Sequence, residues 1–232
     1  MKFGSDGKIS GERPTRHYEV VLSFPCESLS DRTRHYYKAA GPGTTVDMAC
    51  HHVISWNIIQ AFWNCLCEAK ASESKTNTDR RHEILRTYLS TFGVPKPQLK
   101  DMAKEMQDGK FKAKEDWGAR ICWSANNLVI GPKTRSDDPG SSLDFPLAPA
   151  DIYGGRVSAL RAAGRNMTDF TSTGNLDLAD RAVQHFSGIR HQKIMEWDEE
   201  VWTIAAESPH YAPSQNHGAP IQPTWRVRNA AD

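Results

Sequence analysis

The apolar pattern of the chain changes its period at Ser55, and this change limits the fold more than any other feature. Residues 45–54 (TVDMACHHVI) are rich in β-branched and apolar side chains and predict a strand. After Ser55 the large apolar residues recur with the period of an α-helix, and we expect them to lie in the core. The stripe consists of Trp56, Ile59, Phe62, Trp63 and Leu66.

Other segments repeat both patterns. Strand-like composition occurs over 17–24 (HYEVVLSF) and again over 119–130 (ARICWSANNLVI). The further helical segments are about 79–92, 97–108, 155–164 and 176–205. Gly188 is a weak point within the last of these helices. The chain therefore predicts an α+β fold that is mostly helical, with few strands.

Composition excludes several classes of protein. The 29 basic and 28 acidic residues give a net charge of +1, so the whole-chain charge supplies no attraction to nucleic acid or to an anionic membrane. No run of about 18 apolar residues is present, which excludes a membrane span. The polar N-terminus (MKFGSDGKIS) predicts no Sec-type signal peptide. Five scattered cysteines without a C-x-x-C pair are typical of a reducing compartment.

The sharpest local motif is Cys50-His51-His52, which ends a predicted strand just before a predicted helix. Neighbouring strand residues point to opposite faces, so His51 and His52 (the His pair) can serve one site only where the strand ends. Hydrolysis of a phosphodiester needs a base that deprotonates water near neutral pH, and histidine has an ordinary pKa near 6.5. A divalent ion would neutralise charge on the phosphate and the leaving oxygen. The motif favours one histidine as metal ligand and the other as base.

The His pair with the apolar residues and Trp56 that follow it, and the later Asn126-Asn127-Leu128, resemble the His-Me finger (HNH) nuclease superfamily. The likeness is greatest to the double-histidine toxin nuclease modules of bacterial polymorphic toxins. Residues 131–140 (GPKTRSDDPG) are similar to loops of such modules. Two positions depart from the family pattern: Ser55 replaces a proline that usually follows the His pair, and Cys50 replaces a small residue. The resemblance implies a ββα-metal element embedded in the α+β domain.

The resemblance also implies roles for individual residues. His52 would be the general base, His51 a metal ligand, and Asn127, 75 positions after His52, would orient the base. Arg135 would bind the substrate. The cofactor would be one divalent metal ion, with Mg²⁺ expected first and Mn²⁺, Ni²⁺ or Zn²⁺ as alternatives.

The last metal ligand stays open among three candidates: the adjacent pair Asp137 and Asp138, or His185, or His191. Asp137 and Asp138 closely follow the Asn motif and offer oxygen ligands for Mg²⁺ or Mn²⁺. His185 follows Asn175-Leu176 in a second Asn-Leu…His pattern, and His191 lies six positions further along the chain. A spacing of six residues places His185 and His191 on different faces of a helix. We take Asp138 and His185 as the expected ligands beside His51.

The implied function is metal-dependent endonuclease hydrolysis of DNA by an antibacterial toxin or effector domain. Its partners would be a DNA substrate and a cognate immunity protein. It would act in a reducing cytoplasm after delivery into a target cell by a specialised secretion system. We expect a flexible N-terminal arm over 1–16, a single nuclease-like domain over 17–205 with a helical insertion at 55–118, and an extended Pro-rich segment over 206–232.

Two other functions fit the same residues. The first is a non-enzymatic helical binding or adaptor protein, in which the His pair is structural. The second is a cysteine-dependent hydrolase, because Cys50 directly precedes His51. Phosphate-binding P-loops, dinucleotide-binding turns, G-x-S-x-G, H-E-x-x-H and the zinc-deaminase motif are all absent from the sequence.

Overall fold

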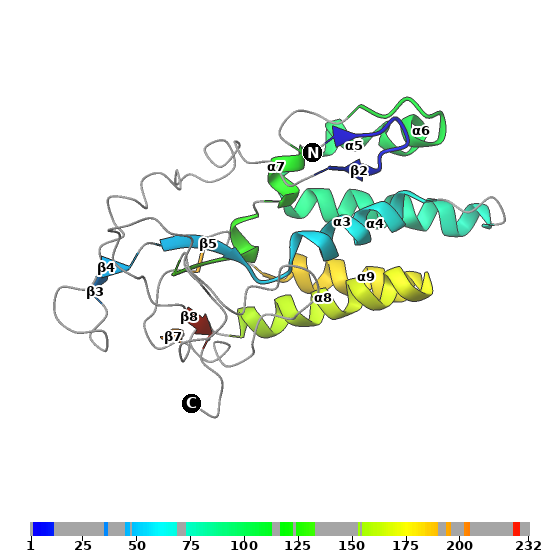
Figure 1. Ribbon diagram of the computed structural model, residues 1–232. Helices are drawn as coiled ribbons and strands as arrows, with labels where there is room; N and C mark the ends of the chain where they lie inside the picture. The colour runs from blue at the N-terminus through cyan, green and yellow to red at the C-terminus, as the bar shows by residue number, and fades with distance from the viewer. Residues whose placement is uncertain are drawn as a thin grey trace.

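The structure is a computed structural model in which helix predominates over strand, as the sequence predicts (Figure 1). The described residues are 2–11, 35–36, 45–46, 48–68, 73–112, 117–122, 124–132, 153, 155–189, 194–195, 202–204 and 225–227. None of the helices formed by these residues has both the length and the apolar character that crossing a membrane requires.

The helical elements gather mainly in the middle and the second half of the chain. They are α3 (Trp56–Cys67), α4 (Lys75–Thr91), α5 (Lys96–Leu99), α6 (Met102–Gln107), α7 (Trp117–Cys122), the 3₁₀ turn η2 (Ala125–Asn127), α8 (Arg156–Thr173) and α9 (Leu176–Ser187).

The described strands pair as four antiparallel two-stranded sheets. The pairs are β1 (Lys2–Phe3) with β2 (Ile9–Ser10), β3 (His35–Tyr36) with β4 (Thr45–Val46), β5 (Met48–His52) with β6 (Leu128–Pro132), and β7 (Trp202–Ile204) with β8 (Trp225–Val227). Of these sheets, the one formed by β5 and β6 contains the His pair.

Four helices in two layers enclose the main core. Figure 1 shows α3 and α4 above α8 and α9. Aromatic rings join the layers: Phe62 of α3 lies 5.4 Å from Tyr88 of α4 and 5.6 Å from Phe170 of α8, between ring centroids. Tyr88 in turn lies 5.8 Å from Phe186 of α9. These edge-to-face contacts connect the two layers of helices.

Helix α3 forms where the change of period predicts it. Ser55 is its N-cap, and the Ser55 hydroxyl accepts a hydrogen bond from the Ile58 N–H. The five residues of the predicted apolar stripe are its buried residues, which confirms the helical pattern. The helix therefore begins four residues after His52 and fixes the direction in which the chain leaves the candidate site.

Three predicted elements are divided or shortened in the structure. The helix expected over 97–108 is divided into α5 and α6. The strand expected over 119–130 begins only at Leu128, because Trp117 and Ile121 are buried one helical turn apart on α7. The helix expected over 176–205 ends at Ser187, beside Gly188, and residues 202–204 form β7.

Helix α8 is longer than predicted. The sequence predicts a helix over 155–164, whereas α8 continues to Thr173. Met167 and Phe170 extend its buried face by two turns, and Gly174 ends it with a φ of 72°, a left-handed conformation that favours glycine. The additional turns provide the surface on which α9 packs.

The first residues of the chain, expected as a flexible arm, include the hairpin of β1 and β2. Ile9 is buried, and its backbone N–H and C=O both bond to the Asn64 side chain of α3, at 2.6 and 2.8 Å. The Trp63 indole N–H donates to the Gly7 carbonyl at 2.8 Å. The hairpin is therefore docked on α3 by both polar and apolar contacts.

Several expectations fall outside the described residues. The strand expected over 17–24 and the loop residues Arg135, Asp137 and Asp138 are among these, and so is His191. Of the Pro-rich segment 206–232, the structure describes only β8.

Candidate active site

The pairing of β5 with β6 brings the two motifs of the sequence together. His51 lies opposite Val129, and His52 lies opposite Leu128. The Cα atoms of directly opposed residues are about 4.5–5.5 Å apart, and Asn127 is one residue, about 3.8 Å, further along the chain. The His pair and Asn127 are therefore near neighbours, although 75 positions of sequence separate His52 from Asn127.

One ring nitrogen of His52 has a defined partner. His52 Nε2 lies 2.7 Å from the carbonyl oxygen of Cys122, at the end of α7. A carbonyl oxygen only accepts hydrogen bonds, so Nε2 is the nitrogen that holds the proton in the neutral ring. The unprotonated nitrogen is then Nδ1, which is the atom that can accept a proton. The imidazole is largely buried, with 8% of the residue exposed.

Asn127 supports the turn that follows the His pair. Its Oδ1 accepts from the Ile54 N–H at 2.8 Å, and its Nδ2 donates to the Ile54 carbonyl at 2.9 Å. Its own backbone carbonyl accepts from the Val53 N–H at 2.9 Å. The expected role was to orient the His52 ring, whereas these bonds hold the backbone two residues after His52.

Strand β6 is held on both of its edges. On one side it pairs with β5, and on the other Val129 forms a parallel bridge with Met195. The Ile130 N–H donates to the Met195 carbonyl, and the Met195 N–H donates to the Leu128 carbonyl, each at 2.9 Å. Leu128, Val129 and Met195 are all buried. The strand opposite the His pair is therefore anchored in the core.

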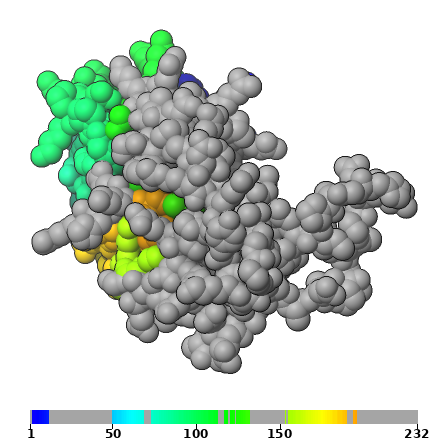
Figure 2. Space-filling model, turned by 90° about the vertical axis from the view of Figure 1, so that its left-hand side faces the viewer, coloured from blue at the N-terminus to red at the C-terminus, as the bar shows by residue number. Residues whose placement is uncertain are grey.

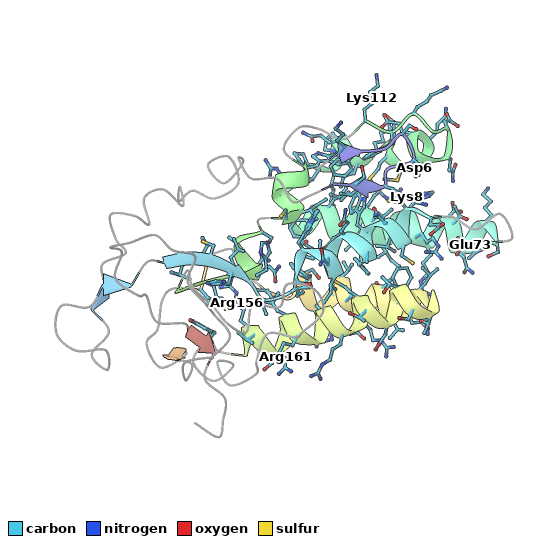
Figure 3. All side chains as sticks on the ribbon, viewed as in Figure 1. Asp6, Lys8, Glu73, Lys112, Arg156 and Arg161 are labelled. Carbon is cyan, nitrogen blue, oxygen red and sulfur yellow. The ribbon has the colours of Figure 1, made fainter. Side chains whose placement is uncertain are left out.

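Helix α8 contacts the candidate site at two points, one on η2 and one on the turn that follows the His pair. Its first residue, Arg156, donates from a terminal guanidinium nitrogen to the Ala125 carbonyl at 3.0 Å. Two turns later Gly164 lies against Ile54, so closely that an added Cβ would be 3.6 Å from the Ile54 side chain. Figure 3 shows Arg156 near β5 and Arg161 further along α8. Burial lowers the pKa of the Arg156 guanidinium.

The structure describes two of the expected metal ligands, His51 and His185. His51 is buried at the candidate site, with 7% of the residue exposed. His185 lies on the exposed side of the last turn of α9. Within the described part of the chain, no group of three or more His, Cys, Asp or Glu side chains could hold a metal ion. Asp138 and the expected substrate-binding Arg135 lie outside that part.

Sequence reasoning missed two contributors to the site. The carbonyl of Cys122 bonds His52, and the guanidinium of Arg156 bonds Ala125. A backbone carbonyl is present in every residue, so no sequence signal marks the role of Cys122. Arg156 opens a helix after two glycines, and only the packing of α8 on η2 reveals its position.

No protein-family model, curated protein or solved structure matches this chain.

Proposed function

We propose that the protein is a divalent-metal-dependent endonuclease that hydrolyses phosphodiester bonds of DNA. The observation that supports this most is the contact of His52 Nε2 with the Cys122 carbonyl. It defines a tautomer in which Nδ1 can accept a proton from water, as a general base must. The His pair also stands at the end of a strand, where both histidines can serve one site.

Each residue of the proposed site has its own role in the reaction. His52 Nδ1 takes the proton of the attacking water, while Nε2–H stays bonded to the Cys122 carbonyl, which stabilises the imidazolium that forms. Asn127 keeps the turn after His52 in place through Ile54. His51 would hold the metal with Asp138 or His185. When bound, the ion would neutralise charge on the phosphate and on the leaving oxygen.

The residues that would bind the metal influence which ion the site prefers. Imidazole nitrogen suits Ni²⁺ and Zn²⁺, whereas Mg²⁺ and Mn²⁺ prefer oxygen ligands. His51 and His185 would favour Ni²⁺ or Zn²⁺, and Asp138 would add the oxygen that Mg²⁺ and Mn²⁺ prefer. The choice of ion in an assay is therefore a test of which residues complete the site.

The test is plasmid nicking with each of Mg²⁺, Mn²⁺, Ni²⁺ and Zn²⁺, and with a chelator. His52→Ala should lower the cleavage rate by about 10²–10⁴-fold without changing metal affinity. His51→Ala should weaken metal binding, so that additional metal partly restores cleavage. His82→Ala, at a buried histidine of α4, is the control for a loss of stability alone.

Three outcomes would overturn parts of the proposal. Absence of cleavage with every ion would reject the nuclease and favour the adaptor protein. Activity that survives a chelator but not thiol alkylation would favour the hydrolase that uses Cys50. Equal losses of activity and of melting temperature in both histidine variants, without rescue by metal, would show that the roles are wrongly assigned.

We also propose that this nuclease is an antibacterial effector, delivered into a reducing cytoplasm and neutralised by an immunity protein. This setting rests on the resemblance of the His pair and Asn127 to toxin modules. Expression inside a bacterial cell should degrade its DNA and arrest growth, and His52→Ala should relieve both effects. Growth arrest without DNA damage would reject the proposed target.

A further inference from the structure

One short segment, residues 122–127, contacts the chain on both sides of the point where β5 ends. His52 Nε2 lies 2.7 Å from the carbonyl oxygen of Cys122, at the beginning of the segment. The Val53 N–H donates to the carbonyl of Asn127, at the end of the segment, at 2.9 Å. The path of the chain between these two contacts therefore decides where the partner of the His52 ring lies.

Two polar side chains within this segment bond to each other. Ser124 and Asn126 are both buried, with 5% and 3% of the residue exposed. The Ser124 hydroxyl donates to Asn126 Oδ1, because a carbonyl oxygen only accepts hydrogen bonds. In the backbone, the Asn127 N–H donates to the Ser124 carbonyl at 2.9 Å. The turn η2 is therefore closed twice, once by its backbone and once by these two side chains.

Water has little access to the bond between Ser124 and Asn126. Figure 2 views the end of the molecule at which β5 lies in Figure 1, and bright green, the colour of α7, η2 and β6, shows there only in small areas. A buried polar group that loses its partner is not readily satisfied by water. The two side chains therefore favour the one conformation of η2 in which they meet.

The direction of the Cys122 carbonyl depends on the turn that follows it. Cys122 is the last residue of α7, and the last carbonyl groups of an α-helix have no partner within the helix. Ser124 is only two positions further, a span of about 7 Å at most. A change of the backbone at Ser124 therefore turns or shifts the Cys122 carbonyl, and the partner of His52 Nε2 moves with it.

This partner decides which nitrogen of the His52 ring holds the proton. Either nitrogen of a neutral imidazole can carry it, and a hydrogen bond made by the ring selects the tautomer. With the Cys122 carbonyl in place, the proton stays on Nε2. Only 8% of His52 is exposed, so water is a poor substitute for the carbonyl. Without the carbonyl, both tautomers would be populated.

We infer that Ser124 and Asn126 are positioning residues for His52. Their bond holds the Cys122 carbonyl against Nε2 and so keeps the imidazole in one tautomer. Asn127 holds the backbone after His52, whereas these two residues act on its ring. The inference rests on the proposed function for the role of His52 as base, but the tautomer can be measured without a metal and without cleavage.

The experiment records the ring-nitrogen NMR signals of the histidine-labelled full chain at pH 8 with a chelator, and His52→Gln identifies the signals of His52. The wild type should show mainly the Nε2–H form. Ser124→Ala and Asn126→Ala should each lower the ratio of the Nε2–H form to the Nδ1–H form about three- to tenfold, the worth of one hydrogen bond. The double variant should match the single ones, because all three lose the same bond.

Three further measurements separate positioning from a loss of stability. Ser124→Thr keeps the hydroxyl and should retain the wild-type ratio. Ser90→Ala removes an exposed hydroxyl of α4, which donates to the Arg86 carbonyl, and should leave the ratio unchanged. In plasmid nicking, cleavage by Ser124→Ala should fall in proportion to the fraction of the Nε2–H form, with metal affinity unchanged.

The outcomes separate this inference from the proposed function. A wild-type ratio in both Ser124→Ala and Asn126→Ala would overturn the inference, whether or not the protein cleaves DNA. So would an equal change in Ser90→Ala, or a wild type that already populates both forms. A lowered ratio in a protein that cleaves DNA with no ion would retain the inference and reject the nuclease. Should an alanine variant not fold, Ser124→Cys keeps the size of the side chain with a weak donor, and a wild-type ratio there would overturn the inference.

Discussion

The side chain of Asn127 and the backbone of Ile54 exchange two hydrogen bonds, one in each direction, across 73 positions of sequence. The amide of asparagine can do this because it presents an acceptor and a donor in one plane. Both bonds are buried, and Asn127 has no exposed surface. The connection holds the turn after the His pair against the start of β6.

Replacing Asn127 should therefore destabilise the protein. Asn127→Ala leaves the N–H and C=O of Ile54 buried without these partners, at about 1–3 kcal/mol for each group. Asn127→Asp should cost at least as much, because it puts a second oxygen against the Ile54 carbonyl. Denaturant unfolding measures both losses, with Asn166→Ala on α8 as a half-buried control. Wild-type stability in Asn127→Asp would contradict the hydrogen-bond assignment.

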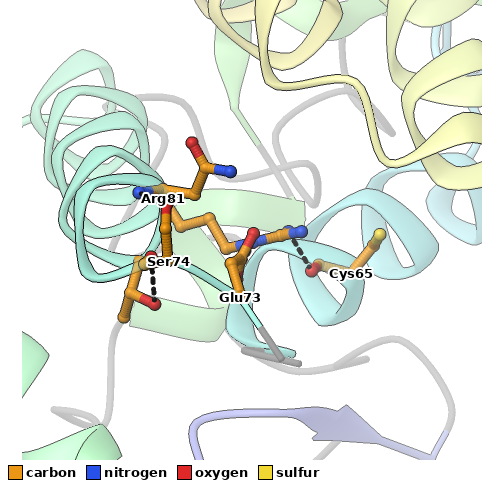
Figure 4. Close-up of polar contacts among 6 residues, drawn as sticks. Cys65, Glu73, Ser74 and Arg81 are labelled. Atoms are coloured by element: carbon orange, nitrogen blue, oxygen red, sulfur yellow. Dashed lines mark hydrogen bonds and ion pairs between the residues drawn. The ribbon is translucent and has the colours of Figure 1, made fainter. Parts of the chain in front are cut away.

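A buried ion pair at the start of α4 gives a second prediction (Figure 4). Arg81 Nε lies 2.8 Å from both carboxylate oxygens of Glu73, and an Arg81 terminal nitrogen donates to the Cys65 carbonyl at 2.9 Å. Glu73→Gln would leave a buried positive charge without its counter-ion, and we expect a loss of about 3–5 kcal/mol in unfolding free energy.

The matched control for this pair lies on the same helix. Arg86 and Glu83 form an ion pair in which 34% and 67% of the side chains are exposed, against 4% and 9% for Arg81 and Glu73. Glu83→Gln should change stability by about 1 kcal/mol or less. Similar losses in the two glutamine variants would show that burial does not set the strength of the Arg81 pair.

His82 predicts a dependence of stability on pH. Burial lowers the pKa of His82, the nearby Arg86 adds to this effect, and Asp79 and Glu73 oppose it. The unfolded chain therefore binds the proton more readily than the folded protein, so stability is lost as pH falls through about 6.5.

The measurement is the melting temperature of the wild type and of His82→Gln from pH 8 to pH 5. Relative to its own value at pH 8, the wild type should lose more stability than the variant. The difference between the two curves removes the contribution of the other histidines. Parallel curves would show that His82 titrates equally in the folded and unfolded states.

The buried hydroxyl of Tyr88 leads us to expect that its removal does not destabilise the protein. This hydroxyl is buried and has no hydrogen-bond partner among the described residues, and burial together with Cys122 raises its pKa. Tyr88→Phe keeps the ring contacts with Phe62 and Phe186 and removes only the unsatisfied group. We expect thermal stability to stay the same or to rise by up to about 1 kcal/mol. A clear loss of stability would reveal a partner for the hydroxyl.

The sequence predicts those parts of this fold that depend on neighbouring residues. The stripe from Trp56 to Leu66 predicts α3 because helical spacing alone places these side chains on one face. The segment 119–122 was predicted wrongly, because a short apolar run has no distinguishing period and the burial of Ile121 on α7 decides its structure. Local pattern therefore suffices where an element is long and amphipathic.

Less of the candidate site than of the fold can be predicted from the sequence. The residue types of the His pair and Asn127 indicate a chemistry, but their proximity depends on a strand pairing that no local pattern contains. The bond of Asn127 to Ile54, instead of the His52 ring, follows from how the turn packs on η2 and α8. Contacts between distant backbone groups are set by tertiary structure alone.

The distance along the chain between β5 and β6 has a consequence for when the site exists. His52 and Cys122, which meet in the site, are 70 positions apart, and α3 to α7 fold between them. Joining the two strands closes a long loop, which costs conformational entropy. The helices between the strands form from local contacts, so their formation does not carry this cost. A chain that has its helices but has not yet joined the two strands has no positioned imidazole. The proposed chemistry would therefore begin only when folding is complete, and mild destabilisation would switch it off before the helices are lost.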